Sequence, residues 1–231
     1  MRIIKPSYKI RKLHQEDIQA IEEAARTCYK SENVMKEGST DKIIQLLLDN
    51  GHESAIEHAG MSVKFIIDRG ISHELVRHRL ASYSQESTRY CNYSKNKFGN
   101  EITVIEPCFY SERNEKDIVR LTRKDHPFLL LAEPDCSDIT KRYTLWYNEC
   151  QRAEDTYFRL LECGATPQEA RNVLPTSLKT EVYMTANFRE WRQIFKLRTA
   201  LDAHPQIREV MIPLLKEMQE RIPILFSDIA V

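Results

Sequence analysis

Two different hydrophobic periodicities occur along this chain of 231 residues, and together they restrict its fold class. Segment 15–29 (QEDIQAIEEAARTCY) repeats apolar residues at intervals of three and four, which is typical of an amphipathic helix. Segment 61–68 (MSVKFIID) places an apolar residue at every second position, which is typical of a strand with one buried and one solvent-exposed face. Helical and strand patterns follow one another without a regular βαβ rhythm. We therefore expect an α+β fold with a central sheet packed by helices.

Capping and turn residues delimit the other predicted elements. A second helix is predicted from an N-cap at Thr40 to a stop at Gly51, and a capping box formed by Thr166 and Glu169 predicts a later helix start. Strands are predicted over 101–107 and 180–186, and helices over 138–163, 188–200 and 206–221. Because no repeat and no Pro/Gly/Ser-rich linker divides the chain, we expect a single domain over residues 1–231. The charged stretch 111–125, part of a predicted insertion over 111–137, is expected to be a mobile surface segment.

Composition excludes several classes of protein. The 34 basic residues are balanced by 34 acidic ones, which argues against a protein that coats nucleic acid. The N-terminus is charged where a secretory signal would be apolar, and no stretch approaches eighteen apolar residues, so we expect a cytoplasmic protein with no membrane association. The six cysteines form no CxxC pair and are predicted to be reduced structural thiols.

Two predicted helices carry an arginine where their apolar stripe continues. Arg198 follows Trp191, Ile194 and Phe195 on one helical face. Arg171 shares a face with Pro167, Ala170 and Leu174. One such arginine is most simply explained by a side chain that reaches the surface or pairs with a buried carboxylate. Two in neighbouring elements favour a ligand.

The stretch 77–90 (RHRLASYSQESTRY) concentrates cationic and hydroxyl side chains. Segment 70–80 reads as a helix with Ile71, Leu75 and Val76 directed inward, so that residues 77–79 would fan over about 200°. This fan indicates either solvent exposure or two different ligands at one helix end. Segment 82–87 adds hydroxyl and amide groups suited to phosphate and heterocycle edges, although it would also suit a polar surface loop.

A metal site is not expected in this chain. The segment 51–58 (GHESAIEH) contains His52 and His58 with two glutamates between them. The zinc protease motif needs its histidines four residues apart on a helix, whereas these are six apart. We therefore predict no metal ligand here.

The stretch 77–90 resembles the signature RHRxxSxxxxSxRY of the flavin-dependent thymidylate synthases, and all of its fixed positions match. Segment 51–58 is similar to the family's GHxxxxEH element, and EARNVLP and ANFREWRQIFKLR are similar to its downstream segments. The resemblance covers most of the chain from Gly51 to about His204. It implies an α+β homotetramer in which several subunits build each site. It also implies that dUMP is converted to dTMP with methylenetetrahydrofolate as one-carbon donor and NADPH as reductant through FAD.

The resemblance also implies roles for individual residues. Arg198 matches the arginine thought to favour ionisation at uracil N3, which makes it the predicted catalytic residue, and Arg171 matches one contributed by another subunit. In this family Glu74 stands where glutamine is frequent, Gln85 where glutamate is frequent, and Gln193 where asparagine or histidine is usual. The predicted dUMP-binding residues are Glu74, Arg77, Gln85, Glu86, Ser87, Thr88, Arg89, Arg171 and Arg198. The predicted FAD-binding residues are Ser54, Arg77, His78, Arg79, Gln85, Asn187, Arg189 and Gln193.

Two other hypotheses remain open at this stage. A nucleic-acid-binding module would use Arg77, Arg79 and Arg89 on phosphates with Tyr83, Tyr90 and Tyr93 stacked on bases, and the zero net charge weighs against it. The second hypothesis is a flavoprotein of the same fold that has lost the methylation activity. Ser87 is predicted to position a ligand and not to act as a nucleophile, because no neighbouring base is apparent.

Overall fold

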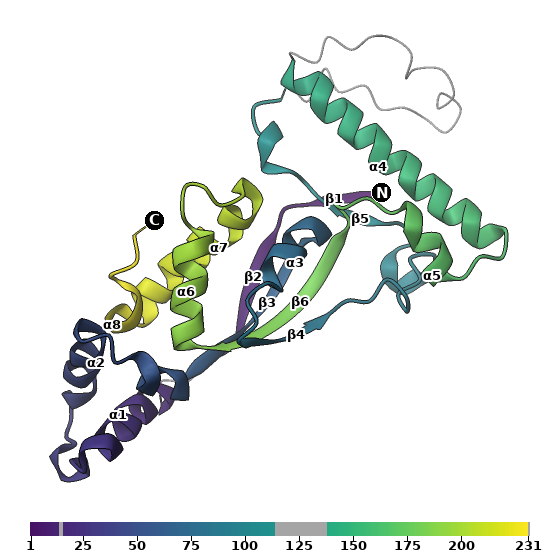
Figure 1. Cartoon of the computed structure of the whole chain (residues 1–231). Helices are drawn as coiled ribbons and strands as arrows, with labels where there is room; N and C mark the ends of the chain where they lie inside the picture. The colour runs from purple at the N-terminus through teal and green to yellow at the C-terminus, as the bar shows by residue number, and fades with distance from the viewer. Residues whose placement is uncertain (14–15, 114–137, 231) are drawn as a thin grey trace. The chain divides into compact units, whose positions relative to one another are not determined.

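The computed structural model describes residues 1–13, 16–113 and 138–230, which form two compact units (Figure 1). Unit 1 contains Met1–Lys5, Asp68–Gly70 and Glu86–Thr180, and unit 2 contains Pro6–Ile67, Ile71–Gln85 and Glu181–Val231. Both units mix helices and strands, so the predicted combination of helices with a central sheet is confirmed. The single domain stays a prediction. Most of the predicted insertion lies outside the described residues.

A four-stranded sheet forms the centre of unit 2, in the order β2-β3-β6-β4. Its strands are β2 (Ser7–Lys12), β3 (Gly60–Asp68), β6 (Lys179–Asn187) and β4 (Ala81–Gln85), and the outer pairs β2–β3 and β4–β6 are antiparallel. The predicted alternation in β3 is confirmed, because Met61, Val63, Phe65 and Ile67 are all buried. Gly60 begins β3 so close to β6 that a Cβ atom there would collide with the carbonyl oxygen of Ala186.

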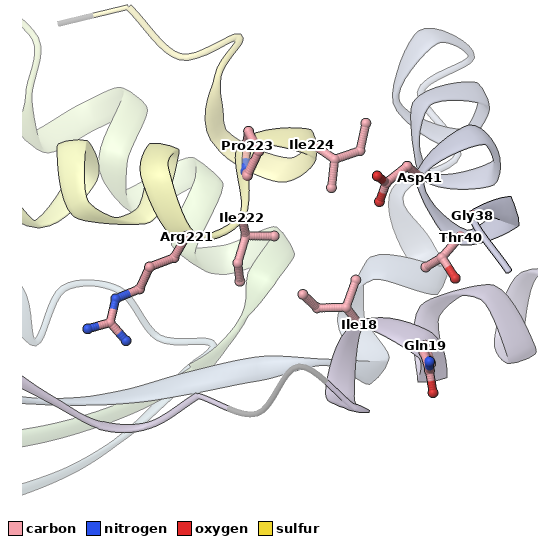
Figure 2. Close-up of a pocket in the computed structure, with 9 residues that line it drawn as sticks. All are labelled: Ile18, Gln19, Gly38, Thr40, Asp41, Arg221, Ile222, Pro223 and Ile224. Atoms are coloured by element: carbon pink, nitrogen blue, oxygen red, sulfur yellow. The ribbon is translucent and has the colours of Figure 1, made fainter.

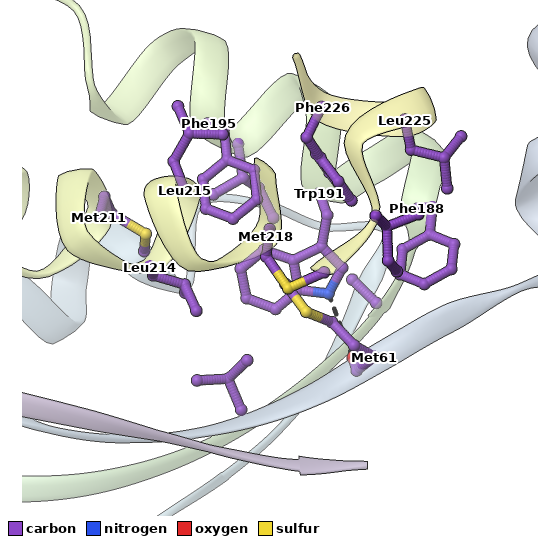
Figure 3. Close-up of a cluster of buried hydrophobic side chains, with 14 of the residues drawn as sticks. Met61, Phe188, Trp191, Phe195, Met211, Leu214, Leu215, Met218, Leu225 and Phe226 are labelled. Atoms are coloured by element: carbon purple, nitrogen blue, oxygen red, sulfur yellow. Dashed lines mark hydrogen bonds between the residues drawn. The ribbon is translucent and has the colours of Figure 1, made fainter. Parts of the chain in front are cut away.

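Helices cover the buried face of this sheet because their apolar stripes need a partner surface. Trp191, at the centre of the cluster in Figure 3, is fully buried and donates its indole N–H to the carbonyl of Met61 over 3.1 Å. Phe195 and Phe226 pack edge to face beside it. The described helices of unit 2 are α1 (Glu16–Tyr29), α2 (Ser39–Asp49), α6 (Phe188–Arg198), α7 (Pro205–Arg221) and α8 (Pro223–Phe226), with the 3-10 helices η1 (Glu32–Val34) and η2 (Glu53–His58). α3 (Arg69–Leu75) begins in unit 1 and continues into unit 2 from Ile71.

Unit 1 has its own smaller core around Tyr93, Tyr157 and Leu178. The strands β1 (Arg2–Ile4) and β5 (Thr103–Ile105) pair in parallel, and the long helix α4 (Ile139–Glu162) packs beside them. The capping box at Thr166 is confirmed at the start of α5 (Pro167–Ala170). The described residues of this unit also form the 3-10 helices η3 (Asn96–Phe98), η4 (Cys108–Tyr110) and η7 (Arg171–Val173).

Three local predictions are wrong, each for a local physical reason. The N-cap of α2 is Gly38 and not Thr40, because the Thr40 hydroxyl instead donates to the buried carboxylate of Glu22 over 2.7 Å. α3 ends at Leu75, and Val76 is exposed where an inward position was predicted. Arg171 is exposed, because α5 is only one turn long and gives way to a 3-10 helix that rotates the following side chains.

No helix in the described ranges is both long and apolar enough to cross a membrane.

Candidate functional site

The guanidinium of Arg198 is held at the end of α6 by groups from two segments of unit 2. Its Nε donates to Nε2 of His78 over 3.0 Å, and its Nη1 and Nη2 donate to the carboxylate and the carbonyl of Glu74 over 3.0 and 3.1 Å. The side chain is 20 % exposed, which agrees with its predicted place on the apolar stripe of Trp191. A guanidinium offers five N–H donors. Three are bonded, which leaves two N–H groups without a partner among the described residues.

His78 is buried and its protonation state follows from its neighbours. The Nε of an arginine is always a donor, so Nε2 of His78 must accept and carries no proton. Burial, followed by the charge of Arg198, lowers the pKa of His78 from 6.5 to about 4. At neutral pH the ring is therefore uncharged, and its single proton sits on Nδ1.

A tight turn after α3 places His78 inward. The backbone N–H groups of Arg77 and His78 donate to the carbonyls of Glu74 and Leu75. The hydroxyl of Tyr83, on β4, lies 2.8 Å from the carbonyl oxygens of both Leu75 and His78, and its single proton is donated to one or the other. Arg77 and Arg79 on either side are exposed. The predicted fan of cations thus comes from a turn, with the histidine buried and both arginines exposed.

Glu190 faces the other edge of the imidazole ring. Its Oε1 lies 3.5 Å from Nδ1 of His78, its side chain is 11 % exposed, and burial raises its pKa. The backbone N–H of Glu190 is capped by the side chain of Asn187, the N-cap of α6, over 2.8 Å. The backbone of the first turn of α6 is therefore capped by Asn187, and the carboxylate of Glu190 is left to face His78.

A cavity of about 370 Å³ in unit 2 brings together three of the predicted FAD-binding residues. Asn187, Arg189 and Gln193 line it, with Glu190 and Lys196 from the same helix. Glu53, Glu57, Leu80 and Arg192 complete its lining. The lining carries three cations beside three carboxylates, while the exposed Leu80 offers apolar surface.

Two glutamates hold Arg189 in place at this cavity. The guanidinium forms ion pairs with Glu57, at 2.5 Å, and with Glu53, at 3.6 Å. The hydrogen bond to Glu57 raises the pKa of Arg189. Ser54, the predicted FAD-binding residue in η2, is exposed next to Glu53.

The predicted dUMP-binding residues are divided between the two units. Unit 2 contains Glu74, Arg77, Gln85 and Arg198, and Gln85 donates its amide to the hydroxyl of Ser72 over 3.0 Å. Unit 1 contains Glu86, Ser87, Thr88, Arg89 and Arg171. Which of them hold dUMP stays a prediction.

Within unit 1, the carboxylate of Glu86 contacts other side chains of the same unit. Its carboxylate pairs with Lys179 at 2.8 Å and accepts a hydrogen bond from Tyr93. Thr88 is buried and its hydroxyl accepts a hydrogen bond from Arg171 over 3.4 Å. Arg89 is exposed with its guanidinium over the ring of Tyr90. Arg89 and Arg171 are therefore the cations of this set that are accessible to an anion.

A larger cavity in unit 2, of about 590 Å³, lies elsewhere and contains none of the predicted site residues (Figure 2). Ile18 of α1 points toward Ile222, at the end of α7, across it, whereas the side chain of Arg221 points away from α1. Thr40 and Asp41 of α2 form a further wall. Its mixed lining shows no convergent set of polar groups.

The nucleic-acid hypothesis loses two of its three stacking side chains. Tyr93 is buried in the core of unit 1, and the hydroxyl of Tyr83 lies 2.8 Å from two backbone carbonyl oxygens. Only Tyr90 of the three is exposed. A stacking platform for bases is thus not formed by these tyrosines.

No group of three or more His, Cys, Asp or Glu side chains is arranged to bind a metal in the part of the chain that the structure describes.

Two further residues of this region were not among the predicted site residues. Glu190 stands at the third position after the Asn187 cap, where an acidic residue is usually a helix-capping feature, so its contact with His78 has no sequence signal. Arg192 is buried and forms two hydrogen bonds to the carboxylate of Asp228, at 2.7 and 2.6 Å. The spacing of Arg192 one position after Trp191 gave no reason to expect burial.

Comparison with known proteins assigns the family. A sequence model described as "Thymidylate synthase complementing protein" matches residues 10–224. The flavin-dependent thymidylate synthase of Mycobacterium avium is 31% identical over 211 residues, covering 90% of this chain and 78% of the relative. That of Geobacter sulfurreducens is 29% identical over 216 residues, covering 90% and 80%.

A solved structure has the same fold. The UMP/dUMP methylase PolB from Streptomyces cacaoi, bound with 5-Br dUMP, matches with a TM-score of 0.70 at 24% identity, covering 98% of this chain and 96% of that one. The family model covers most of the chain, and the relatives span nearly all of it. The resemblance found in the stretch 77–90 is thus confirmed, and the chain belongs to the family of flavin-dependent thymidylate synthases, which are enzymes.

Proposed function

We propose that this enzyme converts dUMP to dTMP, with methylenetetrahydrofolate as one-carbon donor and NADPH as reductant through FAD. The observation that carries the proposal is the guanidinium of Arg198, held beside the motif residue His78 with two N–H donors unengaged among the described residues. The family membership and the dUMP analogue bound to PolB support the choice of substrate. The cytoplasmic location stays a prediction.

Arg198 would act on the charge of the uracil ring. Carbon 5 becomes nucleophilic when the N3 proton is withdrawn, because electron density then moves into the ring. A partly desolvated guanidinium favours that anion more strongly than one in water. Its contacts to Glu74 and His78 hold the planar fork in one orientation, so little reorganisation is needed when the ring arrives.

Asn187, Arg189 and Gln193 would hold FAD, since they line one cavity together. When bound, the flavin supplies the transfer of electrons from NADPH. The cavity of about 370 Å³ offers room for part of a dinucleotide, which fits the predicted use of residues from several subunits. Arg189 gives a fixed positive charge there, because Glu53 and Glu57 orient it.

A homotetramer with shared sites is part of this proposal. Arg89 and Arg171 are exposed in the single chain, so both could reach a nucleotide bound by a second copy. Light scattering on the purified protein would test this. A monomer that bound dUMP tightly would contradict shared sites.

The proposed reaction is tested by reconstitution. We expect dTMP, measured by liquid chromatography, when the purified protein is supplied with FAD, dUMP, methylenetetrahydrofolate and NADPH, and no dTMP when any one of the last three is omitted. A flavin-coloured protein that forms no dTMP would instead support the flavoprotein that has lost methylation. Separate ligand losses in His78→Ala (FAD) and Arg89→Ala (dUMP) would support distinct sites.

A further inference from the structure

The imidazole of His78 is clamped between two oppositely charged groups of the same helix. Arg198, at the last position of α6, donates to Nε2, and Glu190, in the first turn of α6, faces Nδ1 at 3.5 Å. Glu74 of α3 and Tyr83 of β4 contact the same region, Glu74 through Arg198 and Tyr83 through the carbonyl of His78. The ring of His78 therefore connects the first and last turns of α6 to the turn after α3, where the signature at residues 77–90 begins.

We propose that Glu190 is a positioning residue, whose carboxylate is the acceptor on the Nδ1–H side of His78 and thereby keeps Nε2 available to orient the guanidinium of Arg198. The role of this contact in catalysis rests on the proposed function, whereas the contact itself does not. Glu190 also lines the cavity that contains Asn187, Arg189 and Gln193. It therefore connects the predicted flavin side of the site to the predicted uracil side.

Two physical arguments favour this role over helix capping. The side chain of Asn187 already caps the N–H of Glu190, so this end of α6 has its polar partner without the carboxylate. A buried imidazole N–H without an acceptor keeps the full cost of losing its water, so an acceptor on the Nδ1 side stabilises this tautomer. Without it, the neutral ring gains by moving its proton to Nε2, and that change removes the acceptor that Arg198 uses.

The test measures the tautomer directly. The protein is produced with 13C-labelled histidine, and the Cδ2 chemical shift distinguishes the two neutral tautomers. A His78→Gln variant identifies the resonance among the seven histidines. We expect the Nδ1–H tautomer in the wild type and in Glu190→Gln, whose amide oxygen can still accept. In Glu190→Met, of similar volume but with no comparable acceptor, we expect a shift toward the Nε2–H tautomer. An unchanged Cδ2 shift in Glu190→Met would overturn the proposal.

Activity gives a second readout. In Glu190→Met we expect kcat for dTMP formation to fall on the order of tenfold, with the KM for dUMP little changed and substantial rescue in Glu190→Gln, as when an orienting partner of a histidine is removed. Glu149→Ala, an exposed acid on α4, is the matched control with wild-type kcat. Should Glu190→Met fail to fold, Glu190→Asp replaces it, because the shorter carboxylate cannot approach Nδ1 as closely. An unchanged tautomer there would equally refute the contact. If even the wild type forms no dTMP, the proposed function fails while the Cδ2 shift still decides the role of Glu190.

Discussion

Replacing Arg198 with lysine separates its predicted catalytic role from its structural role. Lysine keeps the positive charge but concentrates its donors on one atom, so it cannot reach both Nε2 of His78 and the two oxygens of Glu74. We expect dUMP to bind still, while methylation falls by about 10²–10³, the usual loss of one well-placed electrostatic group, or about 2.7–4 kcal/mol of transition-state stabilisation.

The structural cost of the same substitution is smaller. Two of the three hydrogen bonds are lost, each with a net value of about 0.5–1.5 kcal/mol, and the partial exposure of Arg198 reduces this further. A loss of about 2 kcal/mol would lower Tm by roughly 4–8 °C for a chain of this size. The folded population at 25 °C would remain dominant, since domains are typically stable by about 5–15 kcal/mol. Unfolding therefore cannot account for a hundredfold loss of rate.

The deciding assay is single-turnover dTMP formation at saturating dUMP and folate by enzyme reduced in advance, beside a separate measurement of flavin reduction by NADPH. We expect the second rate to survive, because it does not involve the uracil anion. Arg221→Lys is the control, because Arg221 is half exposed at the end of α7 and pairs with Glu217. A wild-type rate of dTMP formation in Arg198→Lys would remove Arg198 from the chemistry and leave it a structural residue.

Three further predictions concern stability. The pKa of His78 is about 4 in the folded protein, below its ordinary 6.5, so between these values the unfolded chain binds more protons and stability falls as the pH drops. We expect urea titrations between pH 6.5 and 4 to show a smaller loss of stability in His78→Gln than in the wild type. An identical pH dependence of the two proteins would contradict the low pKa of His78. Gly60→Ala should lower the free energy of unfolding by about 1–3 kcal/mol, because the added methyl group would lie 2.9 Å from Cα of Asn187 and closer still to the carbonyl oxygen of Ala186. An unchanged urea midpoint would show that β3 and β6 can move apart at no cost. Asp228→Ala leaves the buried guanidinium of Arg192 without its carboxylate, so we expect a loss of about 1–3 kcal/mol, less than for a fully buried pair because Asp228 is half exposed; a wild-type Tm would mean that the pair contributes nothing.

Periodicity predicted the elements well where a segment is long and buried on one side. The alternation of β3, the strands β5 and β6, the long helix α4 and the helices α6 and α7 all follow from the spacing of their apolar residues. Short segments were harder. α3 stops at Leu75 and α5 after one turn, because a few local hydrogen bonds outweigh a weak helical pattern there.

The sequence by itself determined the family, through the signature at residues 77–90, and the inward position of Arg198, through its place on the stripe of Trp191. Only the tertiary structure decided which side chains surround that arginine. His78 and Glu74 follow one another within a single turn, but their contact with Arg198 spans more than a hundred residues and depends on how α6 packs beside the turn after α3. Glu190 shows the limit most clearly. Local sequence gives it an ordinary helix-start position, and its orientation toward Nδ1 of His78 exists because burial of both groups against the sheet favours a polar partner for each.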